Sequence, residues 1–71
     1  MDDHISRGTV RVIEMVGVSP ESFEDAVRQA IRGAAPQVGG INGVEVLRLT
    51  GRVSGNDVIE FHANVKIAYL S

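Results

Sequence analysis

Cysteine is absent from this chain of 71 residues, and so is tryptophan. Without cysteine the chain can form neither a disulfide nor a thiolate metal site. Aromatic residues make up only 4% of the sequence, although hydrophobic residues make up 44%. A domain of this length buries only about 60% of its unfolded surface, and its core alone supplies roughly 3–5 kcal/mol or less. We therefore expect copies of the chain to assemble and to bury apolar surface between them.

A strong charge of one sign is also missing. The formal net charge is −2, which is too weak to indicate a nucleic-acid or anionic-membrane partner. No apolar run reaches the roughly 18 residues of a membrane span. The polar start, from Met1 to His4, does not resemble a signal peptide. The sequence predicts a cytoplasmic protein with a flexible tail over residues 1–7 and a single domain over residues 8–71.

The first half of the domain predicts a strand followed by a helix. Residues 9–16 are rich in β-branched side chains and stop at Gly17, which is typical of a strand. Ser19 and Pro20 are typical of a helix start, with Ser19 as the N-cap, and Pro36 predicts an end near residues 34–35. The apolar residues between them recur at helical spacing, at Phe23, Ala26, Val27, Ala30, Ile31 and Ala34. Because half of this stripe is alanine, another element, most simply a curved sheet, must approach the helix closely.

The second half predicts a hairpin of two strands. Residues 44–53 alternate imperfectly, and Gly51 within them indicates a bulge or a close backbone approach. Residues 54–57 form a tight turn in which Gly55 and Asn56 can take positive φ. Residues 58–70 alternate clearly, with Ile59, Phe61, Ala63, Val65, Ile67 and Tyr69 on one face. The chain is therefore an α+β domain with the element order β-α-β-β.

The last strand of this order has two consequences. It spans about 13 residues, or roughly 43 Å, which is long for so small a domain. We expect its far end to pair or pack with a neighbouring subunit. One helix covers only one sheet face, so the polar face with Glu60, His62, Asn64 and Lys66 is free to line a solvent channel or a ligand site.

Several polar residues have both a functional and a structural interpretation. His62 is either a ligand-facing or metal-binding histidine, or a strand residue that is hydrogen-bonded to a neighbour. Four charged residues can face one another across the hairpin or between subunits, and ion pairing is the favoured interpretation for them over metal or phosphate contacts. These four residues are Glu45, Arg48, Arg52 and Glu60.

Metal-binding and catalytic patterns are weak in this sequence. Asn56 and Asp57 are the only local candidate for calcium, and turn chemistry explains them adequately. Asp2, Asp3 and His4 could hold copper or nickel only if Met1 were removed, so a tail is the better interpretation. No serine has a histidine at motif spacing, and Gly39-Gly40 lacks the lysine and the helix of a phosphate loop. We expect a protein that is not an enzyme and has no metal site.

The sequence resembles the dodecin family over nearly its whole length. The resemblance is carried by the order and spacing of several short stretches rather than by any one of them. These are Arg11 to Gly17, Ser19-Pro20 with the amphipathic helix, Val44 to Val46, Gly51, and Phe61 to Tyr69 with Lys66 inside. The resemblance implies a three-stranded antiparallel sheet wrapped around one helix. It also implies a hollow homododecamer that stores or buffers flavin without being an enzyme.

The resemblance also implies where a flavin would bind. Flavin-binding members have a stacking Trp, a hydrogen-bonding Gln and often an Arg at positions that are Gly43, His62 and Thr50 in this sequence. With their neighbours, the implied cofactor-binding positions are Gly43, Glu45, Arg48, Thr50 and His62. The leading hypothesis is a dodecin-like shell that sequesters FMN, riboflavin or another small planar ligand. The alternative is a shell that has lost the flavin pocket and binds metal ions, another metabolite or nothing. A weaker third is an enzyme subunit with a composite active site at an interface.

Overall fold

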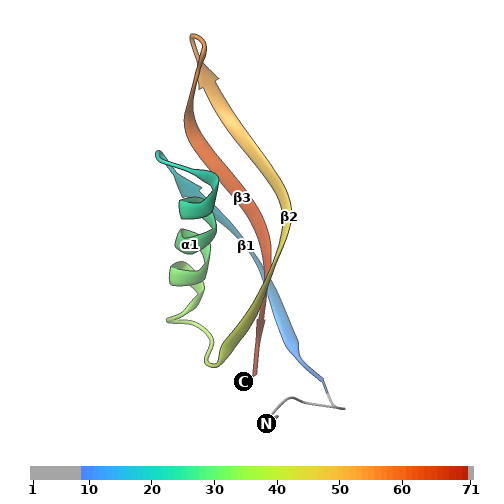
Figure 1. Ribbon diagram of the computed structural model, residues 1–71. Coiled ribbons are helices and arrows are strands. Elements are labelled where there is room, and N and C mark those ends of the chain that lie inside the picture. The colour runs from blue at the N-terminus through green and yellow to red at the C-terminus, as the bar shows by residue number, and fades with distance from the viewer. Residues whose placement is uncertain (1–8, 71) are drawn as a thin grey trace.

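The computed structural model describes residues 9–70 and shows one helix packed on one face of a three-stranded sheet (Figure 1). The elements follow the order β1 (Arg11–Ser19), α1 (Phe23–Ala34), β2 (Ile41–Ser54) and β3 (Asp57–Tyr69). The strand order in the sheet is β1-β3-β2, and both pairings are antiparallel. The predicted fold class, element order and antiparallel sheet are confirmed.

Strand β1 runs past the glycine at which the sequence predicted its end. Gly17 lies inside the strand and is buried beneath α1. A Cβ atom at this position would lie 1.8 Å from the carbonyl oxygen of Ala26 and 2.8 Å from the amide nitrogen of Ala30. The helix therefore crosses β1 at a distance that only glycine permits, and Gly17 is a packing position rather than a strand end.

The prediction that Ser19 caps the helix is wrong. The N-cap is Ser22, whose Oγ accepts a hydrogen bond from the amide of Asp25 at 2.9 Å. Ser19 is instead the last residue of β1 and is fully buried. Its Oγ donates to Asp25 Oδ2 at 2.7 Å and accepts from the amide of Glu21 at 2.9 Å. Ser19 thus ties the turn between β1 and α1 to the first turn of the helix, and a closer serine caps the helix.

Helix α1 packs through the predicted alanine stripe. Ala26, Ala30 and Ala34 are buried against β1 and β3, and the larger apolar side chains flank them. The helix ends as predicted, with the amide of Ala35 donating to the carbonyl of Ile31 before Pro36. On its outer surface Arg28 Nη2 lies 2.9 Å from Glu24 Oε2, one helical turn earlier.

The irregular alternation of β2 has a different cause from the one predicted. The pairing with β3 shifts between Val46 and Arg48, so Leu47 is an extra residue in a bulge. The register is continuous through Gly51, which is therefore not a bulge, although a Cβ there would lie 3.1 Å from Val58 Cγ1. In the hairpin turn Gly55 has a φ of 65°. Among residues 9–70 only glycines have positive φ.

Strand β3 is the centre of the sheet and supplies the largest buried side chains of the core. Ala63, Val65 and Ile67 are fully buried against the helix, as the alternation predicted. The hairpin end of β2 and β3 extends beyond α1, and the molecule is 50 Å long but only about 20 Å across (Figure 1). The predicted length of β3, 13 residues, is confirmed. The exposed part of the strand is its beginning, at the hairpin.

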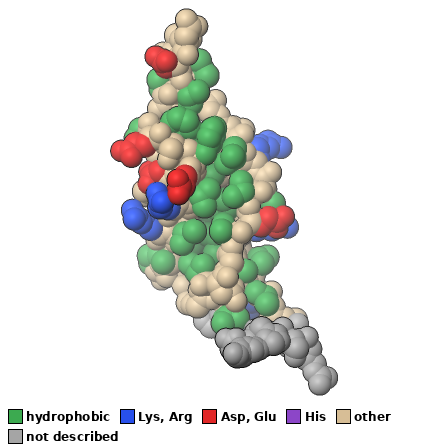
Figure 2. All heavy atoms as spheres, viewed as in Figure 1, with side chains coloured by type: hydrophobic (Ala, Val, Ile, Leu, Met, Phe, Trp, Pro, Cys, Tyr) green, Lys and Arg blue, Asp and Glu red, His purple; other side chains and the backbone are tan. Residues whose placement is uncertain are grey.

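Large hydrophobic side chains remain exposed outside the helix-covered core. Figure 2 shows a band of them running beside α1 along the strands. On the helix side of β2, Val44, Val46 and Leu49 pair with buried β3 residues but are themselves exposed. The other exposed large hydrophobics are Val10, Val12, Val16, Val18, Leu47, Val53, Val58, Ile59 and Leu70. Exposed apolar patches of this kind are typical of surfaces that contact other molecules.

Candidate functional site on the open face

The sheet face opposite α1, called the open face below, carries all five predicted site residues. Because Ala63, Val65 and Ile67 point to the helix, the residues between them on β3 point the other way. The register pairs Gly43 with Ala68, Glu45 with Lys66, Arg48 with Asn64 and Thr50 with His62. The open face thus contains Gly43, Glu45, Arg48, Thr50 and Arg52 of β2, Glu60, His62, Asn64, Lys66 and Ala68 of β3, and Val12, Glu14, Val16 and Val18 of β1.

The five predicted residues form a strip rather than one compact cluster. His62 and Ala68 are six residues apart on β3, which corresponds to roughly 20 Å of strand. Thr50 and His62 are direct cross-strand neighbours, and Arg48 lies one pair further along. Gly43 lies at the opposite end of the strip, opposite Ala68. Within one chain, a small ligand on His62 and Thr50 would therefore not reach Gly43.

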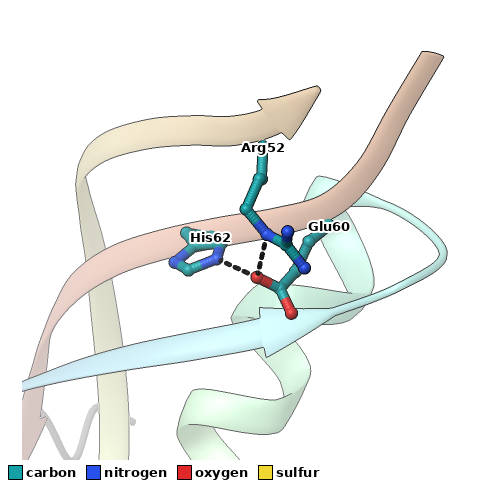
Figure 3. Close-up of polar contacts among 3 residues, drawn as sticks. All are labelled: Arg52, Glu60 and His62. Carbon is teal, nitrogen blue, oxygen red and sulfur yellow. Dashed lines mark hydrogen bonds and ion pairs between the residues drawn. The ribbon is translucent and has the colours of Figure 1, made fainter. Parts of the chain in front are cut away.

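A polar cluster surrounds the carboxylate of Glu60 at the hairpin end of this strip (Figure 3). His62 Nε2 lies 2.9 Å from Glu60 Oε1, and Arg52 Nε donates to the same oxygen at 3.3 Å. His62 and Glu60 come from β3, and Arg52 reaches across from β2. The side chains of His62 and Glu60 are about one-third exposed, at 34% and 33%. The cluster is therefore accessible to a ligand while its geometry is held by the sheet.

The two contacts stabilise the charged form of Glu60. The hydrogen bond from His62, followed by the one from Arg52, lowers the pKa of the Glu60 carboxyl from its ordinary value of 4.5. The side chain is therefore a carboxylate at neutral pH and can only accept hydrogen bonds. The expected ion pairing across the hairpin is confirmed for Arg52 and Glu60.

The residues on the two sides of the cluster differ in polarity. On the β1 side, Val18 pairs with His62 and Val16 with Asn64, and these valines are 44% and 54% exposed. On the β2 side the neighbours are Thr50 and Arg48. A ligand on His62 would thus meet apolar side chains on one flank and hydrogen-bonding groups on the other.

Other candidate chemistry lies outside this face or outside the described residues. Residues 9–70 contain no group of three or more histidine, cysteine or acidic side chains placed to hold a metal ion. Asp57 pairs with Ser54 across the hairpin turn. Asp2, Asp3 and His4 lie outside the described residues. Within residues 9–70 the helix is too short and too polar to cross a membrane.

Comparisons with known proteins identify the family. Residues 9–71 match the sequence profile of dodecin. The chain belongs to the dodecin family. Dodecin from Streptomyces coelicolor is 29% identical, with 92% of this chain and 93% of that chain covered and a TM-score of 0.83. Dodecin from Streptomyces davaonensis is 26% identical, with 86% and 90% covered and a TM-score of 0.80.

Two further results complete the comparison of this dodecin-family chain. A Thermus thermophilus protein shares the fold at 23% identity, with 86% of this chain and 90% of that chain covered and a TM-score of 0.81. No curated relative matches the chain at the sequence level. The resemblance seen in the sequence is confirmed as family membership and as fold.

The three aromatic residues of this dodecin chain lie off the open face. Phe23 of α1 and Phe61 of β3 pack edge to face with ring centroids 4.9 Å apart, on the helix side of the sheet. Tyr69 alternates with Phe61 and lies on the same side of β3. Among residues 9–70 the open face therefore has no aromatic side chain on which a ring could stack. At its end of the strip Gly43 has no side chain, so only its backbone could contact a ligand.

The sequence interpretation left out two members of the polar cluster. Arg52 and Glu60 were assigned to ion pairing and not to the ligand site. The alternation already placed Glu60 on the same face as His62, since residues two apart on a strand share a face. It could not single out the partner on β2, because a register shift between Arg52 and Val53 decides that Arg52 lies opposite Glu60.

Proposed function

We propose that the chain assembles into a closed homododecamer that binds and stores a small planar molecule on the open face, without catalysing a reaction. A flavin, riboflavin or FMN, is the leading candidate. The observation that carries the proposal is the polar cluster at Glu60 beside exposed valines, on the face that carries the cofactor-binding positions implied by the dodecin resemblance. A cytoplasmic location stays a prediction from the sequence.

Assembly is supported by what one chain leaves uncovered. Its fully buried apolar side chains are small or medium in size, from alanine to isoleucine. Val44, Val46 and Leu49 remain exposed beside the helix. Burying one such side chain contributes about 1.5–3 kcal/mol, which exceeds what most single surface contacts supply. Copies that cover these exposed apolar side chains would gain the stability that one chain lacks.

Ligand binding is supported by the division of the open face into an apolar and a polar part. Val16 and Val18 can contact the flat face of a ring system. His62 and Thr50 can hydrogen-bond to its polar edge. Glu45 and Arg48 continue the strip along β2 and would contact a larger ligand or a second one.

A second candidate function is favoured by one specific observation. The open face has no aromatic side chain among residues 9–70, and the family resemblance implies Gly43 at the position of the stacking Trp. A stacking partner contributes about 0.5–1.5 kcal/mol beyond the area that it buries. A shell without this contribution would bind another metabolite, metal ions or nothing.

Native mass spectrometry of the purified protein tests both parts of the proposal together. We expect a species of about twelve-fold the chain mass, the number of copies that the dodecin resemblance implies. Titration with riboflavin, followed by quenching of flavin fluorescence, should show saturable binding at micromolar concentration. A stable monomer or dimer would contradict the assembly. A dodecamer that leaves flavin fluorescence unchanged would favour the second candidate.

A further inference from the structure

The contact between His62 and Glu60 fixes more than the position of the imidazole ring. The Glu60 carboxylate can only accept, so the 2.9 Å contact requires a proton on His62 Nε2. Arg52 Nε donates to the same oxygen and helps to keep the carboxylate charged. In the neutral ring only one nitrogen carries a proton. Nδ1 of neutral His62 is then an acceptor.

This acceptor is available to a ligand. The second ring nitrogen of His62 points away from Glu60 in Figure 3. Among the described residues no hydrogen bond is made to it, and the His62 side chain is 34% exposed. The residue directly opposite on β2 is Thr50, and side chains of such pairs have Cβ atoms about 4.5–5.5 Å apart. The Thr50 hydroxyl can donate a hydrogen bond. A fixed acceptor and an available donor therefore lie side by side on the open face.

We propose that Glu60 is a positioning residue that sets the Nε2–H tautomer of His62, so that His62 Nδ1 and the Thr50 hydroxyl together select ligands with an imide edge. Such an edge presents an N–H donor next to a carbonyl acceptor, as in the pyrimidine part of a flavin. This inference rests on the proposed function, because it names the ligand group that the same face would recognise. His62 and Thr50 would together supply the acceptor and the donor that a single amide side chain supplies.

The tautomer is measured without any ligand. Long-range ¹H–¹⁵N spectra of the neutral His62 ring distinguish a protonated from an unprotonated nitrogen, and the His62→Gln variant assigns the signals against those of His4. We expect a protonated Nε2 in the natural protein and a mixture of tautomers in Glu60→Gln. A proton on Nδ1 in the natural protein would overturn the inference.

The ligand preference is measured with two flavins. Riboflavin carries the imide N–H, and 3-methylriboflavin carries a methyl group in its place. We expect riboflavin to bind more tightly by on the order of tenfold, because methylation leaves His62 Nδ1 without its donor. Glu60→Gln should reduce this preference to about twofold or less. The control Glu24→Gln should retain it, since Glu24 also accepts from an arginine but lies on the outer surface of α1.

The possible outcomes separate this inference from the proposed function. Equal binding of the two flavins would overturn the preference while leaving flavin storage supported. A preference that Glu60→Gln leaves unchanged would overturn the role of Glu60. If neither flavin binds the natural protein or Gly43→Trp, in which a ring is supplied for stacking, both flavin storage and the imide preference are wrong. The spectra then still decide whether Glu60 sets the tautomer.

Discussion

The part of the sheet that α1 covers and the hairpin that extends beyond it are built from similar residues but buried to different degrees. Under the helix, Val65 and Ile67 of β3 are fully buried. At the hairpin end of the same strand, Val58 and Ile59 are exposed. The difference shows that α1 covers only part of the apolar surface that the strands of one chain present. The covered half stabilises the subunit itself, and the uncovered half is suited to contact with other copies.

The largest effect is expected from disturbing the covered half at Gly17. In Gly17→Ala the new Cβ would lie 1.8 Å from the carbonyl oxygen of Ala26, so the helix must move off the sheet. We expect a loss of more than about 3 kcal/mol in the free energy of unfolding, above the usual cost of overpacking. Chemical denaturation followed by circular dichroism measures this loss.

A second glycine provides a matched control for Gly17. A Cβ at Gly33 would meet only the Met15 side chain, at 3.7 Å, which is ordinary contact. Gly33→Ala in α1 should therefore stabilise the protein by about 0.4–1 kcal/mol. If the two alanine variants had equal stability, the close approach of the helix to β1 would not explain why a glycine is required at position 17.

The next effect is expected from the uncovered half. Val58→Asp places a charge on the exposed hairpin, where the proposed assembly would bury the side chain. An unpaired buried charge is strongly unfavourable, so the oligomer should dissociate or fail to form. Native mass spectrometry reports the change. Gln29→Asp, on the exposed surface of α1, is the control and should leave the assembly intact. If the Val58→Asp protein assembles like the natural one, the hairpin is not part of the interface.

A smaller and opposite effect is expected at Gly43. A Cβ at this position would lie 3.5 Å from Ala68 Cβ, which is ordinary contact, and the backbone of Gly43 does not have positive φ, so a residue with a Cβ is accommodated there without backbone strain. Because His62 and Gly43 lie too far apart within one chain to hold the same small ligand, this prediction depends on the proposed assembly bringing Gly43 of one copy near the ligand of another. Gly43→Trp should then tighten riboflavin binding by about 0.5–1.5 kcal/mol or more, measured by fluorescence quenching. Gln29→Trp supplies the same ring away from the open face and should change nothing. Unchanged affinity in Gly43→Trp would indicate that the ligand does not reach Gly43.

These comparisons also show how far the sequence predicts this molecule. The alternation of β3 and the alanine stripe of α1 predicted the core, because both depend only on the local period of the chain. The helix cap was placed at Ser19 rather than Ser22, since two serines three residues apart satisfy the same local rule. Only the packing of Ser19 against Asp25 distinguishes them. The five predicted site residues share one face of the sheet, but the polar cluster depends on a cross-strand register that the shift between Arg52 and Val53 sets.

The smallest effect is expected from the ionisation of Glu60. Its pKa is lowered in the folded protein by His62 and Arg52, so folding favours the carboxylate. The unfolded chain binds a proton first as the pH falls, and the contribution of Glu60 to stability is therefore present above about pH 4.5 and lost as the pH drops through the folded-state pKa. Glu60→Gln should thus be less stable than the natural protein at neutral pH and approach it in acid. Denaturation of both proteins at pH 7 and about pH 3 measures this convergence. A stability difference that does not change with pH would mean that Glu60 acts through packing and not through its charge, and would weaken its assignment as the group that orients His62.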